Sequence, residues 1–202
     1  MRLYVGSWIA RRGKGGVAVR IVAGKARGTK LTSVPGLRTR PTGDRVKEAL
    51  FNMLGPSILG SSFLDLYAGS GAIGLEALSR GAEKVVWVDA NPACTTQIRK
   101  NLEKTRLQGG VIVTRDVFRA LAQLNRRGEH FDFVFLDPPY DQSLVGETVR
   151  YLDHLNVLRK QGIIIAEASK KEEGSLDMSK LCLKRTKRYG DTVLLFYEVR
   201  GS

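Results

Sequence analysis

Short apolar segments alternate with amphipathic segments along most of this 202-residue chain, and this alternation constrains the fold more than any other feature. Each apolar segment has the length of a strand, and the segments between them carry apolar residues at helical spacing. We expect strands at 63–67, 84–89, 111–114, 131–136 and 162–168, separated by helices at 73–80, 92–107, 117–125 and 144–155. Such α/β repeats form a doubly wound parallel sheet that binds ligands at the carboxyl ends of its strands.

The carboxyl end of the chain departs from this alternation. Residues 181–188 and 192–200 are both strand-like and flank a turn at Tyr189-Gly190-Asp191. Two such runs around a short turn predict an antiparallel pair.

The amino end also differs. Residues 17–24 and 31–34 predict a small basic β-hairpin, and a helix capped by Thr42 or Asp44 should follow and stop at Gly55-Pro56. We therefore divide the chain into three parts. These are a disordered extension (1–18), a basic hairpin with its loop (19–41) and the α/β domain (42–202).

The chain carries a net charge of +13, and the excess is concentrated near its amino end. Asp44 is the first acidic residue, and ten Lys and Arg residues precede it. An acid-free basic arm favours a polyanionic partner such as a nucleic acid, because each neutralised phosphate releases condensed counterions. A solvated tail is the alternative interpretation of the same charge.

Several other classes of protein are excluded by composition. No apolar run approaches the roughly 20 residues that span a bilayer, and the first residues do not form a secretory signal. Cys94, Cys182, His130 and His154 have no metal-ligand spacing. We therefore expect a cytoplasmic protein with reduced cysteines, no membrane segment and no metal site.

A glycine-rich motif, Gly69-Ser70-Gly71-Ala72-Ile73-Gly74, follows the first expected strand. It matches the dinucleotide fingerprint, and Asp89 ends the next strand twenty residues after Gly69. Gly69, Gly71 and Gly74 permit a sharp turn and close approach of a ligand to the backbone. Taken alone, the motif fits a nicotinamide-dependent oxidoreductase as well as a methyltransferase.

Acidic residues at the ends of the strands distinguish these two functions. Asp65 precedes the glycine-rich loop, where a carboxylate would repel a pyrophosphate but attract the ammonium and sulfonium groups of S-adenosylmethionine. Asp116 can accept a hydrogen bond from the adenine amino group, and Asp89 can accept from both ribose hydroxyls. Asp137 has no role in hydride transfer. The pattern therefore predicts an S-adenosylmethionine site.

Four further residues complete the expected cofactor site: Tyr67 and Ser70, together with Ala90 and Val117, which could supply an apolar sandwich for the adenine. Structural alternatives exist for several members of this site. Asp116 could instead cap the helix that follows it, as could Asp89, although Asn91 fits that cap better. Ala90 and Val117 could equally be core residues.

The most specific motif is Asp137-Pro138-Pro139-Tyr140. Its prolines stiffen the backbone and leave carbonyl oxygens without nearby amide donors. The amino group of a nucleic-acid base is a poor nucleophile, and hydrogen bonds to the Asp137 carboxylate and the Pro138 carbonyl would orient it toward the sulfonium methyl. Tyr140 could stack on a base turned out of its helix. The motif predicts methyl transfer to such an amine, whereas a rigid turn alone would explain only the prolines.

Together these motifs resemble those of class I methyltransferases that act on amino groups. More narrowly, the chain resembles the bacterial 16S ribosomal RNA guanine-N2 methyltransferases of the RsmD type. The similarity covers roughly residues 19 to 199 and includes RIVAGKARG, LRTRPTGDRVKEALFNML, DLYAGSGAIGLEALSRGA and FLDPPY. The first two segments are the specific ones. The chain departs from the family at its start, because eighteen residues precede Val19 where the family begins with Met.

The resemblance implies a Rossmann-like methyltransferase domain with a seven-stranded, mostly parallel sheet and an antiparallel carboxyl-terminal hairpin. It implies that Thr42 and Arg45 contact the carboxylate of the cofactor. The partner would be 16S rRNA, within the small ribosomal subunit or an assembly intermediate, and the enzyme a monomer. Five residues are candidates for phosphate contacts: Lys25, Arg27, Lys30, Arg38 and Arg40.

Two other functions stay open at this point. An adenine or cytosine amino-methyltransferase acting on DNA or another RNA could use the same D-P-P-Y chemistry, although many such enzymes have Asn in place of Asp. A non-catalytic RNA-binding assembly factor could keep the same fold, although the complete set of acids and glycines argues against it.

Overall fold

The computed structural model describes residues 19–34, 44–139, 143–170 and 177–201. Within these residues, seven strands form one sheet in the order β3-β2-β1-β4-β5-β7-β6. The strands are β1 Ser62–Leu66, β2 Lys84–Asp89, β3 Gly110–Thr114, β4 Phe131–Leu136, β5 Leu158–Ser169, β6 Leu181–Tyr189 and β7 Thr192–Val199. The first five are parallel, and β7 is antiparallel to both β5 and β6. The expected sheet is confirmed.

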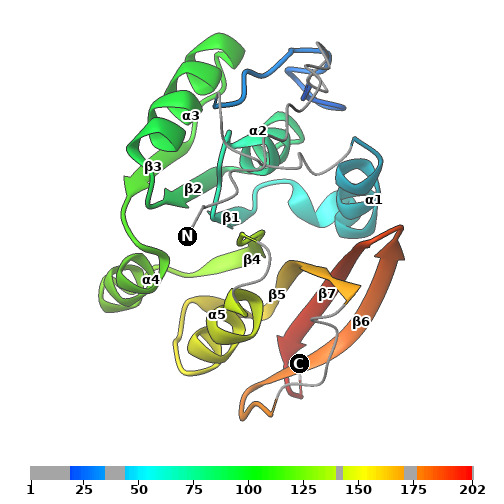
Figure 1. Cartoon of the computed structure of the whole chain (residues 1–202), viewed down its shortest axis with the longest axis vertical. Helices are drawn as coiled ribbons and strands as arrows, with labels where there is room; N and C mark the ends of the chain where they lie inside the picture. Colours follow the sequence, from blue (N-terminus) through cyan, green and yellow to red (C-terminus); the bar gives the residue numbers. More distant parts are fainter. Residues whose placement is uncertain (1–18, 35–43, 140–142, 171–176, 202) are drawn as a thin grey trace, which may run out of the picture.

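Helices cover both faces of this sheet (Figure 1). They are α1 Asp44–Leu54, the short 3-10 helix η1 Gly55–Ile58, α2 Ala72–Ser79, α3 Pro92–Thr105, α4 Val117–Arg126 and α5 Leu144–Asp153. One core joins the sheet to α1, α2 and α3, and a second joins it to α4 and α5. In the described residues, no helix is both long and apolar enough to cross a membrane.

The expected element bounds are confirmed to within a few residues, except at the start of β5. This strand begins at Leu158, which pairs with Phe131, and the pairing shifts register before Phe133 pairs with Ile163. The residues between, Arg-Lys-Gln at 159–161, are exposed and polar. They resemble a loop in sequence, and the expected strand therefore began at residue 162.

Residues 19–34, hereafter the basic hairpin, form two antiparallel arms. Arg20 and Lys30 make an isolated β-bridge, and the Leu31 N–H donates to the Val19 carbonyl at 2.7 Å. The expected return strand at 31–34 is wrong, because the Thr32 N–H and carbonyl bind the side chain of Asn101 instead of another strand. The apolar side chains of the hairpin, those of Val19, Ile21 and Leu31, are buried in the core with α1 and α2.

Asp153 at the end of α5 holds the chain that leads into β6. Its carboxylate accepts hydrogen bonds from the N–H groups of Ser179, Lys180 and Leu181 at 2.7–2.8 Å and from the Ser179 hydroxyl at 2.9 Å. Burial would raise the pKa of Asp153, but these bonds hold it at about 2.

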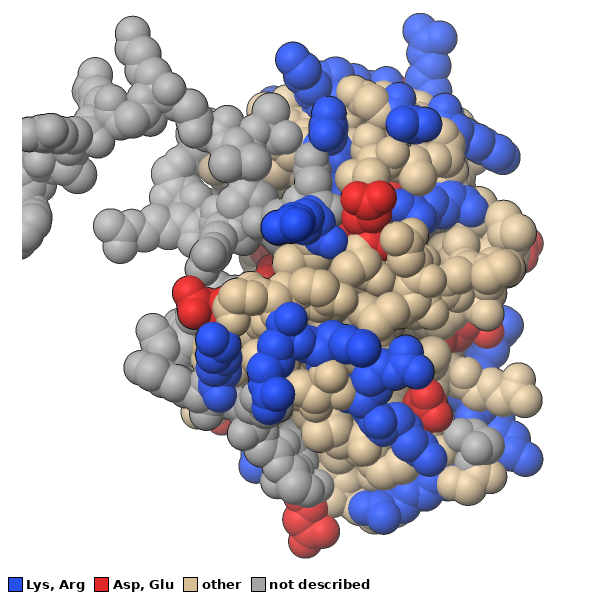
Figure 2. All heavy atoms as spheres, turned by 90° about the vertical axis from the view of Figure 1, so that its right-hand side faces the viewer, with Lys and Arg blue, Asp and Glu red and all other residues tan. Residues whose placement is uncertain are grey.

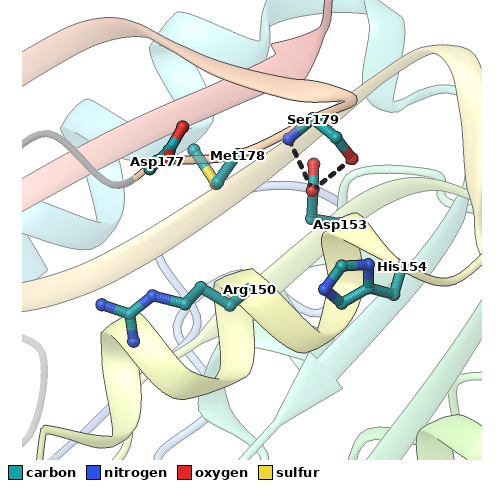
Figure 3. A pocket seen from close by; sticks show the side chains of 6 residues that line it. All are labelled: Arg150, Asp153, His154, Asp177, Met178 and Ser179. Carbon is teal, nitrogen blue, oxygen red and sulfur yellow. Dashed lines mark hydrogen bonds between the residues drawn. The ribbon is translucent and has the colours of Figure 1, made fainter.

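A shallow groove of about 290 Å³ lies beside these contacts (Figure 3). Six residues line it: Arg150, Asp153, His154, Asp177, Met178 and Ser179. The groove lies where α5 ends and β6 begins, at the amino end of the sheet, whereas folds of this kind bind ligands at the carboxyl end. The carboxyl ends of the strands are therefore the expected place for an active site.

Candidate active site

The loop between β1 and α2 is open at the carboxyl edge of the sheet. Gly69 and Gly71 have φ angles of 54° and 76°, in the left-handed region that glycine adopts without steric cost. A Cβ atom added to Gly69 would meet no atom within 4 Å. A ligand can therefore approach the backbone closely at this position.

Tyr67 precedes these glycines and also has a positive φ, of 58°. A residue with a side chain rarely adopts this conformation, and such strain is concentrated at functional sites. The Tyr67 hydroxyl shares a hydrogen bond with the Thr148 hydroxyl of α5 at 2.8 Å. Burial, with smaller contributions from Asp116 and Glu147, raises the pKa of the phenol. Tyr67 thus ties the loop to the helix that follows β4.

Gly74 has a packing role that the sequence motif did not reveal. A Cβ atom there would lie 2.2 Å from Trp87 Nε1 and 2.7 Å from Val85 Cγ1. The absence of a side chain lets α2 pack directly on β2. The Gly74 N–H donates to Asp65 Oδ2 at 2.9 Å, so the helix also orients the carboxylate.

Gly74→Ala is expected to lower the free energy of unfolding by about 3 kcal/mol, because overpacking a rigid core displaces both the indole and the helix. Urea unfolding followed by circular dichroism measures the loss. Gly69→Ala is the matched control and should lose only about 1–2 kcal/mol, through its left-handed φ. Equal losses in the two variants would contradict the packing role.

Asp65 lies at the penultimate position of β1 and is only 2% exposed. Burial raises its pKa from 3.8 to about 8, with a further contribution from Asp89, although the Gly74 hydrogen bond acts in the opposite direction. A bound cation would stabilise the ionised carboxylate. The geometry therefore favours a positively charged ligand beside the loop.

Asp89 ends β2 on the other side of the loop. One carboxylate oxygen accepts from the Gly69 N–H at 2.8 Å and the other from the Asn91 N–H at 2.8 Å. The cap of α3 is Asn91, whose side chain accepts from the Ala93 N–H, so the expectation that Asn91 rather than Asp89 caps this helix is confirmed. Ala90 lies exposed between them.

Asp116 follows β3 and caps α4, since its Oδ1 accepts from the Arg119 N–H at 3.1 Å. The alternative interpretation of Asp116 as a helix cap is therefore correct. This bond occupies one oxygen, and the exposed side chain keeps the other as an acceptor. Val117 is 3% exposed and belongs to the core under α4.

Asp137 directly follows β4, next to Asp65 at the end of β1. Pro138 is buried and Pro139 exposed, whereas Tyr140 lies outside the described residues. Burial raises the pKa of Asp137 well above its ordinary value, and the nearby charges of Glu167 and Asp65 raise it further.

Glu167, a buried residue of β5, was missed by sequence reasoning. Its signal is a lone acid inside the apolar strand segment IIIAEAS. It lies level with Asp137, because Leu136 pairs with Ala166 in the preceding step of the ladder. Although three acids gather here, the described residues contain no cluster arranged to hold a metal ion.

Polar groups of α2 hold the basic hairpin in place. The Glu76 carboxylate is fully buried and accepts from the Val22 and Ala23 N–H groups at 2.7 and 3.0 Å. The Ser79 hydroxyl accepts from the Ala26 N–H at 3.0 Å. Sequence reasoning missed both anchors, although an acid in the apolar helix segment AIGLEALS was the available signal.

Asn101 of α3 connects the hairpin to the glycine-rich loop. Its amide oxygen accepts from the Thr32 N–H, and its amide nitrogen donates to the carbonyls of Thr32 and Ser70 at 3.0 and 2.9 Å. Ser70, one of the expected cofactor residues, therefore takes part in this contact through its backbone carbonyl. Nothing in the sequence singles out Asn101.

The remaining expected site residues fall into two groups. Exposed residues of the described part are Lys25, Arg27, Lys30 and Arg45. Residues outside the described part are Arg38, Arg40, Thr42 and Tyr140.

The comparisons with known proteins agree on one family. Residues 19–198 match the family model described as "Conserved hypothetical protein 95". Putative rRNA methyltransferase YlbH of Bacillus subtilis is 38% identical over 91% of this chain and 100% of its own length. Ribosomal RNA small subunit methyltransferase D of Escherichia coli is 40% identical over 74% of this chain and 74% of its own length.

Solved structures agree with the sequence relatives. The putative methyltransferase yhhF from Escherichia coli matches with a TM-score of 0.81 at 33% identity, over 92% of this chain and 99% of that one. SMU.776, a putative methyltransferase complexed with SAH, matches at 0.62 with 19% identity, over 77% of this chain and 48% of that one, which shows the shared fold alone. With most of its length matched at both levels, this chain belongs to the RsmD-type methyltransferase family and has the class I methyltransferase fold.

Proposed function

We propose that this protein transfers the methyl group of S-adenosylmethionine to the exocyclic N2 of a guanine in 16S rRNA, within the small ribosomal subunit in the cytoplasm. One observation carries the proposal. Asp65 lies at the penultimate position of β1, and Asp137 directly follows the paired strand β4, at the end of the sheet where Gly69 is open; burial raises the pKa of both carboxyls. Such an edge favours a cationic donor and an amine acceptor.

The residues at this edge fit the cofactor, which when bound supplies a methyl group on a cationic sulfur. Asp65 would balance its positive charge, and Gly69 would let its chain approach the backbone. Asp89 accepts one backbone N–H on each oxygen and a further hydrogen bond from the Cys94 thiol, and the lone pair that is left would accept from the ribose hydroxyls. The second oxygen of Asp116 would accept from the adenine amino group. Arg45, with Thr42, would bind the cofactor carboxylate.

Asp137 and Pro138 would position the target amine. The carboxylate and the proline carbonyl accept its two N–H groups and hold its nitrogen in line with the methyl group. As its nitrogen bonds to the methyl carbon, the amine would lose one proton, while the bond from the methyl carbon to sulfur would break and leave a neutral thioether. Because burial and Glu167 raise the pKa of Asp137, its carboxylate is a better proton acceptor than an exposed aspartate.

The names of the relatives support rRNA as the substrate class, and the acid at position 137 favours guanine over the amines of adenine and cytosine. The adenine or cytosine enzyme and the assembly factor described above remain the rival functions. They differ from our proposal in the nucleoside that carries the methyl group, or in whether any nucleoside does.

The test is to incubate the purified protein with methyl-labelled S-adenosylmethionine and three acceptors. These are small subunits assembled from unmodified 16S rRNA, the same rRNA without proteins, and DNA. We expect N2-methylguanosine in digests of the rRNA from the subunits. Label in another nucleoside or in DNA alone would support the first rival. Absence of label from all acceptors would support the assembly factor.

A further inference from the structure

The edge strand β6 carries a dense run of positive charge. Four of the five residues 184–188 are Lys or Arg, none is acidic, and all four basic side chains are exposed. Among the residues that the structure describes, Lys184, Arg185 and Lys187 form no ion pair. These three residues are called the β6 basic surface below. Figure 2 faces the side that carries α1 and β6 and shows Lys and Arg side chains gathered across the lower part of that face, with few acids among them.

This surface extends toward the carboxyl ends of the parallel strands, where Asp137 lies. Because β6 is antiparallel to β7 and β7 to β5, β6 runs in the same direction as β4 and β5. Lys187 lies level with Glu167, since both pair with Leu194, and Glu167 lies level with Asp137. Three strand spacings of about 4.8 Å put the backbone of Lys187 about 14 Å from that of Asp137.

Arg185 and Lys187 also project to the same side of the sheet as the basic hairpin. Their partners on β7 are Phe196 and Leu194, which belong to the core that contains α1, α2 and the hairpin. Directly paired residues on antiparallel strands share a face. The hairpin rests on α2, over β1 and β2, whereas β6 forms the far edge of the sheet. The β4 end with Asp137 therefore lies between two basic elements.

We propose that Lys184, Arg185 and Lys187 bind phosphates of the rRNA on the side of the target base opposite to the basic hairpin. The inference rests on the proposed function for the identity of the RNA. It explains why exposed Lys and Arg residues are concentrated on an edge strand that runs toward the reaction centre. RNA held on both sides of Asp137 would keep a base aligned there.

Lysines on an edge strand also prevent aggregation through edge-to-edge pairing, and this is the competing explanation. It predicts that removing the charges lowers solubility and leaves RNA affinity unchanged. The two explanations therefore differ in a measurable quantity.

The experiment replaces all three basic residues, as Lys184→Gln, Arg185→Gln and Lys187→Gln. It measures binding and methylation of unmodified small subunits at several salt concentrations. We expect affinity to fall by at least about tenfold, and the slope of log affinity against log salt to decrease by about 2, because each lost phosphate contact removes up to about one unit. The rate at saturating subunits should change less than about threefold, and cofactor affinity should not change.

The matched control replaces three exposed basic residues near the amino ends of the strands, as Arg126→Gln, Arg127→Gln and Lys160→Gln. It removes the same net charge, and its affinity should stay within about threefold of wild type. A second variant, Lys184→Arg with Lys187→Arg, should retain full binding, which shows that affinity follows the charge, and the unchanged cofactor affinity of the Gln variant shows that it folds. Equal affinities of the Gln variant and the control would overturn the inference. If wild type binds but does not methylate subunits, the proposed function fails, whereas this affinity comparison still decides the inference.

Discussion

Asp137→Ala is expected to reduce methyl transfer by about 10³-fold or more while leaving the affinity for S-adenosylhomocysteine within a few-fold of wild type. The variant removes the carboxylate that would orient the amine and accept its proton. It leaves intact the contacts of Asp89 and Gly69, which belong to the cofactor side of the site. Single-turnover methylation of saturating small subunits measures the first effect, and calorimetry measures the second.

Asp137→Asn separates orientation from charge. The amide keeps an oxygen acceptor but cannot take up a proton, so its rate should lie between those of wild type and Asp137→Ala. Removing a half-buried carboxyl with a raised pKa should not destabilise the free protein at neutral pH, and thermal unfolding checks this. Activity of the alanine variant close to that of wild type, with the fold intact, would show that Asp137 has no catalytic role.

The sequence predicted the order of elements well because each element is specified locally. Strands β2 and β4 have the expected bounds because both are buried on two faces and contain almost uninterrupted apolar residues. Asn91-Pro92 marked the start of α3 through a local capping preference. The carboxyl ends of strands then located Asp65, Asp89 and Asp137 without knowledge of any contact.

Contacts between distant segments could not be predicted in the same way. Glu76 and Asn101 act on residues 53 to 69 positions away, and a polar residue in a helix gives no sign of such a partner. Glu167 becomes relevant only through the register of β4 and β5. Gly74 fitted a ligand-binding motif, but its distance from Trp87 shows a packing requirement that depends on how α2 crosses the sheet.

Asp65→Asn is expected to weaken S-adenosylmethionine binding on the order of 10²-fold. A carboxylate and a cation in contact interact by about 4 kcal/mol at an effective dielectric constant of about 20, and desolvation offsets part of this. The variant keeps an oxygen that can accept from the Gly74 N–H, so the loop should retain its conformation. Calorimetry at pH 7.5 measures the change, and Asp177→Asn, at an exposed position away from the loop, is the control.

The pH dependence makes this assignment specific to Asp65. Its pKa is about 8 in the free folded protein, and a bound cation lowers it, so binding releases a proton. Affinity should therefore fall by up to about tenfold per pH unit as pH decreases from 7.5 to 6, and less steeply in Asp65→Asn.

Stability should change in the opposite direction. Between pH 4 and 8 the folded protein holds a proton on Asp65 that the unfolded chain does not. The free energy of unfolding therefore decreases as pH rises, by about 1.4 kcal/mol per unit from this group. Asp65→Asn should thus be more stable than wild type at pH 8 although it binds cofactor less tightly. A variant that lost stability at pH 8 with no change in cofactor affinity would show that Asp65 has a structural role and does not balance the charge of the cofactor.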